Sequence, residues 1–189
     1  MNQRNSQAYD EFEGYSPAEM QFVLYDTFGD NSPIQFQKLS EADYKSIPIL
    51  NQVEYLLKLV DKAREVKLTK LGFLPTKVVS KIYDQGFIKD RVGITKLYKE
   101  TDASSINLTR LLIELSGLAK KRNGKLSLTK KSEKYLKNKF ELLKLIFETF
   151  ATKFNWAYYD GYGENRIVQL GFGFSIILLS KYGNKKQVD

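Results

Sequence analysis

An Asn-Gly dipeptide between two basic arms is the feature that most constrains the fold of this chain. Asn123 and Gly124 follow a Lys-Lys-Arg run and precede another lysine. The two central residues of the tightest hairpin turns need positive φ angles, which asparagine and glycine adopt readily. Leu126 and Leu128 then alternate with polar residues, so one face of the second arm packs and the other is solvated. The sequence therefore predicts a basic β-hairpin from Ala119 to Leu128.

Helices are predicted on both sides of this hairpin. Leucines at 108, 111, 112 and 115 follow the i, i+3, i+4, i+7 spacing of one apolar helix face, and Gly117 ends that helix. After the hairpin, apolar residues at helical spacing predict one long helix over about 130–154. A helix, a basic hairpin and a following helix thus span Asn107 to Leu136.

The remaining chain is also predicted to be mostly helical, because capping residues and apolar spacing recur along it. The fold class is therefore mainly α with small β-hairpins. The further expected elements are helices starting at Ser16, Pro48 and Pro75, a short strand at 66–68, and a buried apolar helix over 172–179.

Charge is unevenly distributed along the 189 residues. The net charge is +8, yet residues 58–139 carry 21 basic and 8 acidic side chains, a net of +13. The preceding 57 residues have a net charge of −6, and the last 50 a net of +1. A strongly basic block favours a polyanionic partner such as nucleic acid, although lysines that merely solvate exposed helix faces would give the same composition.

The absence of histidine and cysteine excludes several classes of site. With neither residue in the chain, there can be no Ser-His-Asp triad, no thiolate or imidazole zinc site and no disulfide. We expect no enzyme activity, no cofactor and no metal site. The polar, acidic start and the short apolar runs predict neither a signal peptide nor a membrane span, so we expect a cytoplasmic protein with no membrane partner.

The segment from Ala103 to Leu136 resembles the winged helix-turn-helix superfamily. In this resemblance Leu118 matches the apolar residue after the recognition helix, and Asn123-Gly124 matches the tip of the wing; Ser132 stands where many relatives have glycine. The whole chain also resembles a group of uncharacterised bacterial proteins that share a Leu-Thr-x-x-Gly-x-Leu-Pro segment, here Leu68 to Pro75. In that segment Gly72 is expected to have a positive φ.

The resemblance implies a division of the chain around a winged-helix-like core. We expect a disordered lead-in over 1–15, an N-terminal helical part over 16–66, a winged-helix-like unit over 67–150, and a C-terminal aromatic and glycine-rich helical segment over 151–189 that packs on it.

The partner expected from the resemblance is double-stranded DNA. The outward face of the helix before the hairpin would enter the major groove, where asparagine can pair with adenine and arginine with guanine. Because lysine greatly outnumbers arginine, contacts are expected mostly with the DNA backbone. The candidate DNA-binding residues are Asn107, Thr109, Arg110, Lys120, Lys121, Arg122, Lys125, Lys130 and Lys131.

DNA binding requires the wing lysines and the Arg110 face to be coplanar and exposed. A protein-protein interaction module is the alternative function, in an uncharacterised bacterial or mobile-element protein. It would bury that helix face or expose an apolar patch instead. A hydrolase that uses only carboxylates is a distant third alternative, which a buried pair of acids facing one cleft would support. The sequence predicts neither an oligomeric state nor a DNA target.

Overall fold

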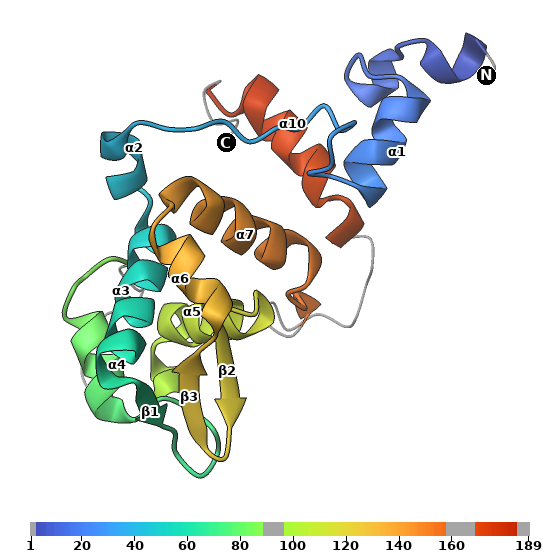
Figure 1. Ribbon diagram of the computed structural model, residues 1–189. Helices are drawn as coiled ribbons and strands as arrows, with labels where there is room; N and C mark the ends of the chain where they lie inside the picture. The colour runs from blue at the N-terminus through green and yellow to red at the C-terminus, as the bar shows by residue number, and fades with distance from the viewer. Residues whose placement is uncertain (1–2, 89–96, 158–168, 185–189) are drawn as a thin grey trace. The chain divides into compact units, whose positions relative to one another are not determined.

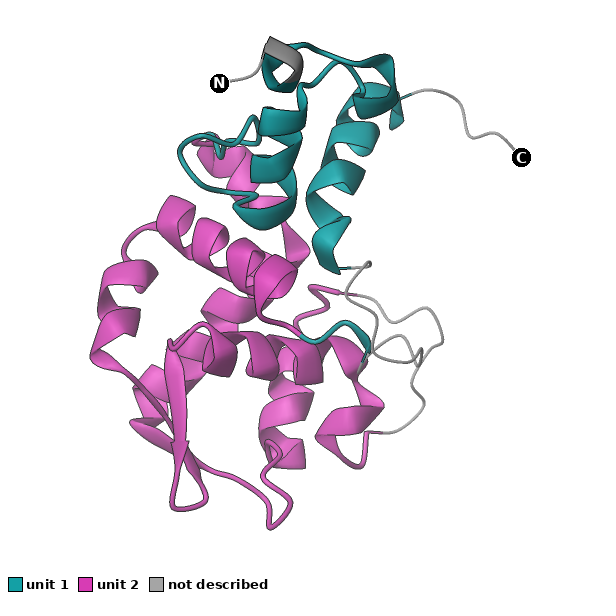
Figure 2. Cartoon of the chain, turned by 90° about the vertical axis from the view of Figure 1, so that its right-hand side faces the viewer, with its two compact units in different colours: residues 1–37, 155–189 teal, residues 38–154 magenta. Residues whose placement is uncertain are grey.

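The computed structural model describes residues 3–88, 97–157 and 169–184. The chain forms two units, which are coloured separately in Figure 2. Unit 1 combines residues 1–37 with 155–189, and unit 2 comprises 38–154. This division differs from the one expected from sequence, because the predicted N-terminal part is shared between both units.

Unit 2 is mainly helical and contains a small sheet, as the sequence predicts (Figure 1). Its described elements, in chain order, are α2 (Glu41–Lys45), α3 (Pro48–Ala63), β1 (Glu65–Lys67), α4 (Thr76–Tyr83), the 3-10 turn η3 (Glu100–Asp102), α5 (Ser104–Leu115), β2 (Ala119–Arg122), β3 (Lys125–Leu128), α6 (Lys130–Leu136) and α7 (Lys139–Thr152).

The predicted hairpin is confirmed, and it forms two strands of a three-stranded antiparallel sheet. The strand order is β1-β3-β2, so β3 lies in the middle. Asn123 and Gly124 have φ angles of 50° and 69°, as a tight hairpin turn requires. Strand β1, far earlier in the chain, pairs Val66 with Leu126. The sheet therefore joins the hairpin to the end of α3.

The core of unit 2 is built on the apolar face of α3. Val53, Leu56, Leu57 and Val60 are all 0% exposed, which confirms the i, i+3, i+4, i+7 spacing as a buried face. Helix α3 contacts α5, β3 and β1. Burial of this one face thus fixes both the sheet and the helix before the hairpin.

The single long helix expected over 130–154 is wrong. The structure has two helices, α6 and α7, separated by Lys137 and Asn138. The side chain of Asn138 accepts a hydrogen bond from the backbone N–H of Glu141 at 3.2 Å, so it caps the start of α7. Apolar spacing continues through this break, which is why periodicity alone misses it.

Unit 1 pairs α1 (Pro17–Tyr25) with α10 (Phe172–Tyr182). Ser16 and Glu19 form the reciprocal cap expected from sequence. A Cβ added to Gly173 would lie 2.5 Å from the carbonyl oxygen of Val23, so this glycine allows the close approach of the two helices. The two helices meet around a small cluster of Met20, Val23 and Ile177.

Two expectations for unit 1 are corrected. Helix α10 is not buried as a whole: its described residues bury Gly173 and Ile177, while Leu179 is 69% exposed. The lead-in contains two 3-10 turns, η1 (Gln3–Ser6) and η2 (Asp10–Phe12), and a bridge between Tyr9 and Tyr15. The glycine-rich stretch over 158–168 lies outside the described residues.

Candidate nucleic-acid interface

The outer face of the three-stranded sheet carries most of the predicted wing cations. Side chains alternate between the two faces of a strand, and residues paired across strands point to the same face. Val66 and Leu126 pair and are buried, so they define the inner face. The residues that share the outer face form two rows across β1, β3 and β2, namely Glu65, Ser127, Lys120 and Lys67, Lys125, Arg122.

The second row places three positive charges side by side. Lys67 is paired with Lys125, and Lys125 is paired with Arg122. Side chains directly opposite in an antiparallel pair lie about 4.5–5.5 Å apart at Cβ, and like charges there are destabilising. The carboxylate of Glu65 forms an ion pair with Lys125. Anions from outside the chain would relieve the rest of the repulsion.

Three of the outer-face cations have no such internal partner. Lys67, Lys120 and Arg122 are exposed, and none of them forms an ion pair or side-chain hydrogen bond with the residues that the structure describes. Lys67 is not among the DNA-binding residues predicted from the sequence. Its alternation with Val66 was visible, but the pairing of β1 with β3, which places it beside the wing, depends on residues about 60 positions apart.

Lys121 lies on the opposite face of the sheet from the other wing cations. It pairs with the buried Leu126, and its Nζ donates a hydrogen bond to the carbonyl of Gly72 at 3.2 Å. The backbone N–H of Leu68 also donates to the carbonyl of Gly124 at 2.8 Å. These two hydrogen bonds thus link the hairpin to the loop before α4, and we call the contact of Lys121 with Gly72 the tether.

The loop before α4 is the Leu68 to Pro75 motif. Gly72 has a φ of 80°, as predicted. Its N–H donates to the carbonyl of Thr69 at 2.8 Å, and the N–H of Thr69 donates to the carbonyl of Phe73 at 2.8 Å. The motif therefore forms a tight turn on which the hairpin rests. Pro75 directly precedes α4 and serves as its N-cap residue.

The two predicted lysines of α6 differ in their contacts. Lys131 donates to the carbonyl of Ser116 at 2.9 Å, and its Nζ lies 5.3 Å from the ring centroid of Tyr135. Lys130 is exposed and forms no ion pair within the described part of the chain. Lys131 therefore links α6 to the end of α5, whereas Lys130 is available for an external contact.

The outward position expected for Asn107, Thr109 and Arg110 is wrong. Their exposed fractions are 7%, 0% and 5%, so none of them can reach a base edge in this conformation. All three make hydrogen bonds inside unit 2. These bonds hold α5 in place and direct the three side chains away from any base.

The reason for two of these burials is Glu100, which is 0% exposed. One carboxylate oxygen of Glu100 accepts hydrogen bonds from Asn107 Nδ2 at 2.6 Å and from Arg110 Nε at 2.7 Å. The other accepts from the backbone N–H of Leu74 at 2.5 Å. An acid buried in unit 2 thus draws the polar side chains of α5 inward and binds the motif loop as well.

Two carboxylates balance the buried positive charge of Arg110. Its second contact is with Glu114, 2.5 Å from a guanidinium nitrogen. Burial lowers the pKa of Arg110, but hydrogen bonds and charge interactions with Glu100 and Glu114 outweigh burial and raise this pKa overall. The residue therefore stays positively charged while it is buried.

Thr109 is held by helix α3. Its hydroxyl donates to the carbonyl of Ser105 at 2.8 Å and accepts from Gln52 Nε2 at 2.8 Å. Gln52 is itself only 2% exposed. This buried polar pair fixes the rotation of α5 about its own axis.

What α5 exposes instead is mostly apolar. Four residues share the face that is left, because steps of three and four place side chains along one line of a helix. Leu115 is 43% exposed, and Leu108 and Leu111 are partly exposed beside the exposed Ser104. Leucine side chains can neither donate nor accept hydrogen bonds, so this face has little capacity to distinguish bases.

Comparisons of the chain with protein-family models, with curated proteins and with solved structures gave no match. Among the described residues no helix has the length and apolarity needed to cross a membrane. The same residues contain no cluster of three or more carboxylates that could hold a metal ion.

Proposed function

We propose that this protein is a winged-helix protein that binds the backbone of double-stranded DNA through the outer face of its sheet. The order of elements in unit 2 supports the first part. Helix α3, strand β1, helices α4 and α5, and a β2–β3 hairpin that pairs with β1 follow one another as a winged helix requires (Figure 1). Helix α5 occupies the position of the recognition helix.

The row of Lys67, Lys125 and Arg122 is the observation that carries DNA binding. Phosphates along a DNA strand would neutralise Lys67, Lys120 and Arg122, which have no ion-pair partner among the described residues, whereas Lys125 is paired with Glu65. The tether, a hydrogen bond from Lys121 to Gly72, links the hairpin to the loop before α4, which reduces the cost of ordering the hairpin backbone on binding. Recognition is led by the sheet and the wing, and α5 contributes little base contact.

Salt dependence of binding tests this proposal. Three unpaired cations, each on one phosphate, would contribute about −2.7 to the slope of log K against log salt. We expect the full chain to bind mixed-sequence duplexes with similar affinities in fluorescence anisotropy, and to weaken steeply as salt rises. No binding at low salt would refute the proposal.

A matched pair of triple variants locates the binding face. Replacing Lys67, Lys120 and Arg122 with alanine removes the unpaired outer-face charges and should flatten the slope by about 2.7. The control replaces Lys38, Lys45 and Lys153, exposed lysines of unit 2 outside the sheet, and changes the net charge equally. Equal effects of the two variants would mean that binding follows net charge rather than the sheet.

A protein-interaction module is the second candidate. Both features expected of it favour it, because the predicted base-reading face of α5 is buried and its exposed face is apolar. A row of leucines with Leu115 at 43% exposure is an ordinary protein contact and a poor DNA contact. Leu115→Glu tests whether a second copy is the partner. Sedimentation of the wild-type chain as an oligomer, with the variant as a monomer, would support this function. A monomeric wild type would argue against self-association.

A further inference from the structure

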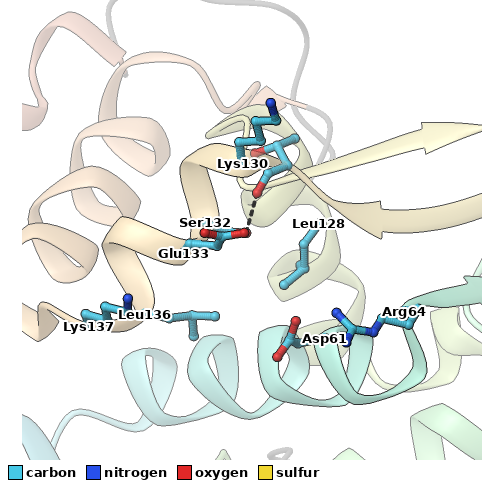
Figure 3. A pocket seen from close by; sticks show the side chains of 9 residues that line it. Asp61, Arg64, Leu128, Lys130, Ser132, Glu133, Leu136 and Lys137 are labelled. Atoms are coloured by element: carbon cyan, nitrogen blue, oxygen red, sulfur yellow. Dashed lines mark hydrogen bonds between the residues drawn. The ribbon is translucent and has the colours of Figure 1, made fainter.

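A hollow of about 550 Å³ lies between the end of α3, the end of β3 and helix α6. In Figure 3 the side chains of Asp61 and Arg64 project from the end of α3, and Leu128 points into the space from β3. Leu136 approaches from α6. Ligand sites of small molecules fall in this range of volume. The walls belong entirely to unit 2 and are separate from the outer face of the sheet.

The charges that line the hollow have both signs and lack partners among the residues that the structure describes. Arg64, Lys130 and Lys137 are basic, and Asp61 and Glu133 are acidic. All five are exposed, and none forms an ion pair or a side-chain hydrogen bond with the described residues. By contrast, the hydroxyl of Ser132 is already used, since it donates to the carbonyl of Thr129 at 2.6 Å.

Arg64 has a backbone conformation that is unfavourable for arginine. Its φ is 62° and its ψ is −43°, where it ends α3 and precedes β1. Its N–H donates to the carbonyl of Asp61 at 3.0 Å, which closes the turn. Glycine adopts positive φ without steric penalty, whereas a Cβ makes it costly. The Arg64 side chain forms no hydrogen bond or ion pair with the described residues that would offset this strain, which indicates a use for its positive charge.

We propose that this hollow binds a small zwitterion of the class of free amino acids and short peptides. The guanidinium of Arg64 would bind the carboxylate, since arginine matches its two oxygens with parallel donors. Asp61 and Glu133 would bind the ammonium group, and Leu128 and Leu136 would contact the apolar part. The two wall carboxylates would repel a phosphate dianion, so opposite charges on one ligand fit the lining better. The hollow shares no residue with the outer face of the sheet.

Thermal unfolding of the full chain tests the proposal directly. The probes are the twenty common amino acids and a set of dipeptides, with sodium phosphate and sodium chloride at equal ionic strength as ionic controls. At a concentration about 100-fold above its Kd, a ligand should raise the unfolding midpoint by about 5–10 °C. The absence of a shift with every zwitterion would overturn the proposal. A shift with phosphate that equals or exceeds the largest zwitterion shift would also overturn it.

Arg64→Gly gives a sharper readout, because it removes the strain and the guanidinium together. We expect its midpoint without ligand to lie above that of the wild-type chain, and its ligand shift to be lost. Asp61→Asn should also lose the shift, which keeps the test decisive if the glycine variant misfolds. Lys62→Ala, an exposed neighbour outside the hollow, should keep it. A lower midpoint for Arg64→Gly, or a ligand shift retained in it, would overturn the proposal.

Discussion

Replacement of Glu100 by alanine should be among the most destabilising single changes in unit 2. The carboxylate is fully buried and accepts hydrogen bonds from Leu74, Asn107 and Arg110. Its removal leaves the buried Arg110 with Glu114 as its remaining ion-pair partner among the described residues. Breaking a buried ion pair by deleting one partner costs about 3–5 kcal/mol. This is a large share of the roughly 5–15 kcal/mol that stabilises an ordinary domain.

Urea unfolding of the full chain, followed by circular dichroism, measures this loss. Glu41→Ala is the matched control, because it removes an acid from the Glu41–Lys139 pair whose carboxylate is 74% exposed. That control should lose much less stability, because water already solvates and screens an exposed ion pair. A similarly small loss for Glu100→Ala would refute the reasoning, since it would mean that Glu100 is solvated.

A double-mutant cycle separates the ion pair from its surroundings. Glu100→Ala leaves the buried charge of Arg110 without its main partner, and Arg110→Met removes that charge. The double variant should therefore be more stable than the sum of the two single losses predicts. Residues in one network couple by about 0.5–3 kcal/mol. Strict additivity would show that the two side chains do not interact in solution.

Three other changes give distinct signatures. Gly72→Ala should lower the free energy of unfolding by about 1–3 kcal/mol, because φ is 80° and the new Cβ would lie 1.9 Å from Lys121 Nζ. Faster hydrogen exchange of the Leu68 amide would confirm that the hairpin has loosened. Gly173→Ala should destabilise unit 1 by about 1–3 kcal/mol, detectable by thermal unfolding, and should leave DNA affinity unchanged. Burial raises the pKa of Glu148, so its charged form disfavours folding. Glu148→Gln should therefore stabilise the protein at neutral pH, and the gain should vanish in acid; a gain independent of pH would contradict this sign.

Local signals in the sequence predicted local structure well. Asn123-Gly124 gave the hairpin and its positive φ angles, and Ser16 with Glu19 gave the start of α1. These features depend on residues a few positions apart, so they can be predicted without knowledge of the rest of the fold. The apolar spacing of α3 also predicted its buried face correctly, whereas the same spacing failed in α5, where of its four leucines Leu112 is buried and Leu115 is 43% exposed.

The orientation of α5 depended on a contact that no local pattern reveals. Asn107 and Arg110 are polar, and polar residues on a helix are ordinarily exposed. Glu100 reverses this by placing a carboxylate inside the unit, next to the backbone of Leu74. The candidate site therefore moved from the helix to the sheet, where Lys67 joined the wing residues through long-range strand pairing.

The strand order also constrains the sequence of events in folding. The middle strand β3 is the last of the three to leave the ribosome, and β1 and β2 make no pairing with each other. The β2–β3 hairpin can close locally within microseconds. Strand β1 must then join across a loop of about 60 residues, at a higher entropic cost. Until it does, the hydrogen-bonding edge of β3 is open, and a truncated chain without β1 would offer that edge to other molecules.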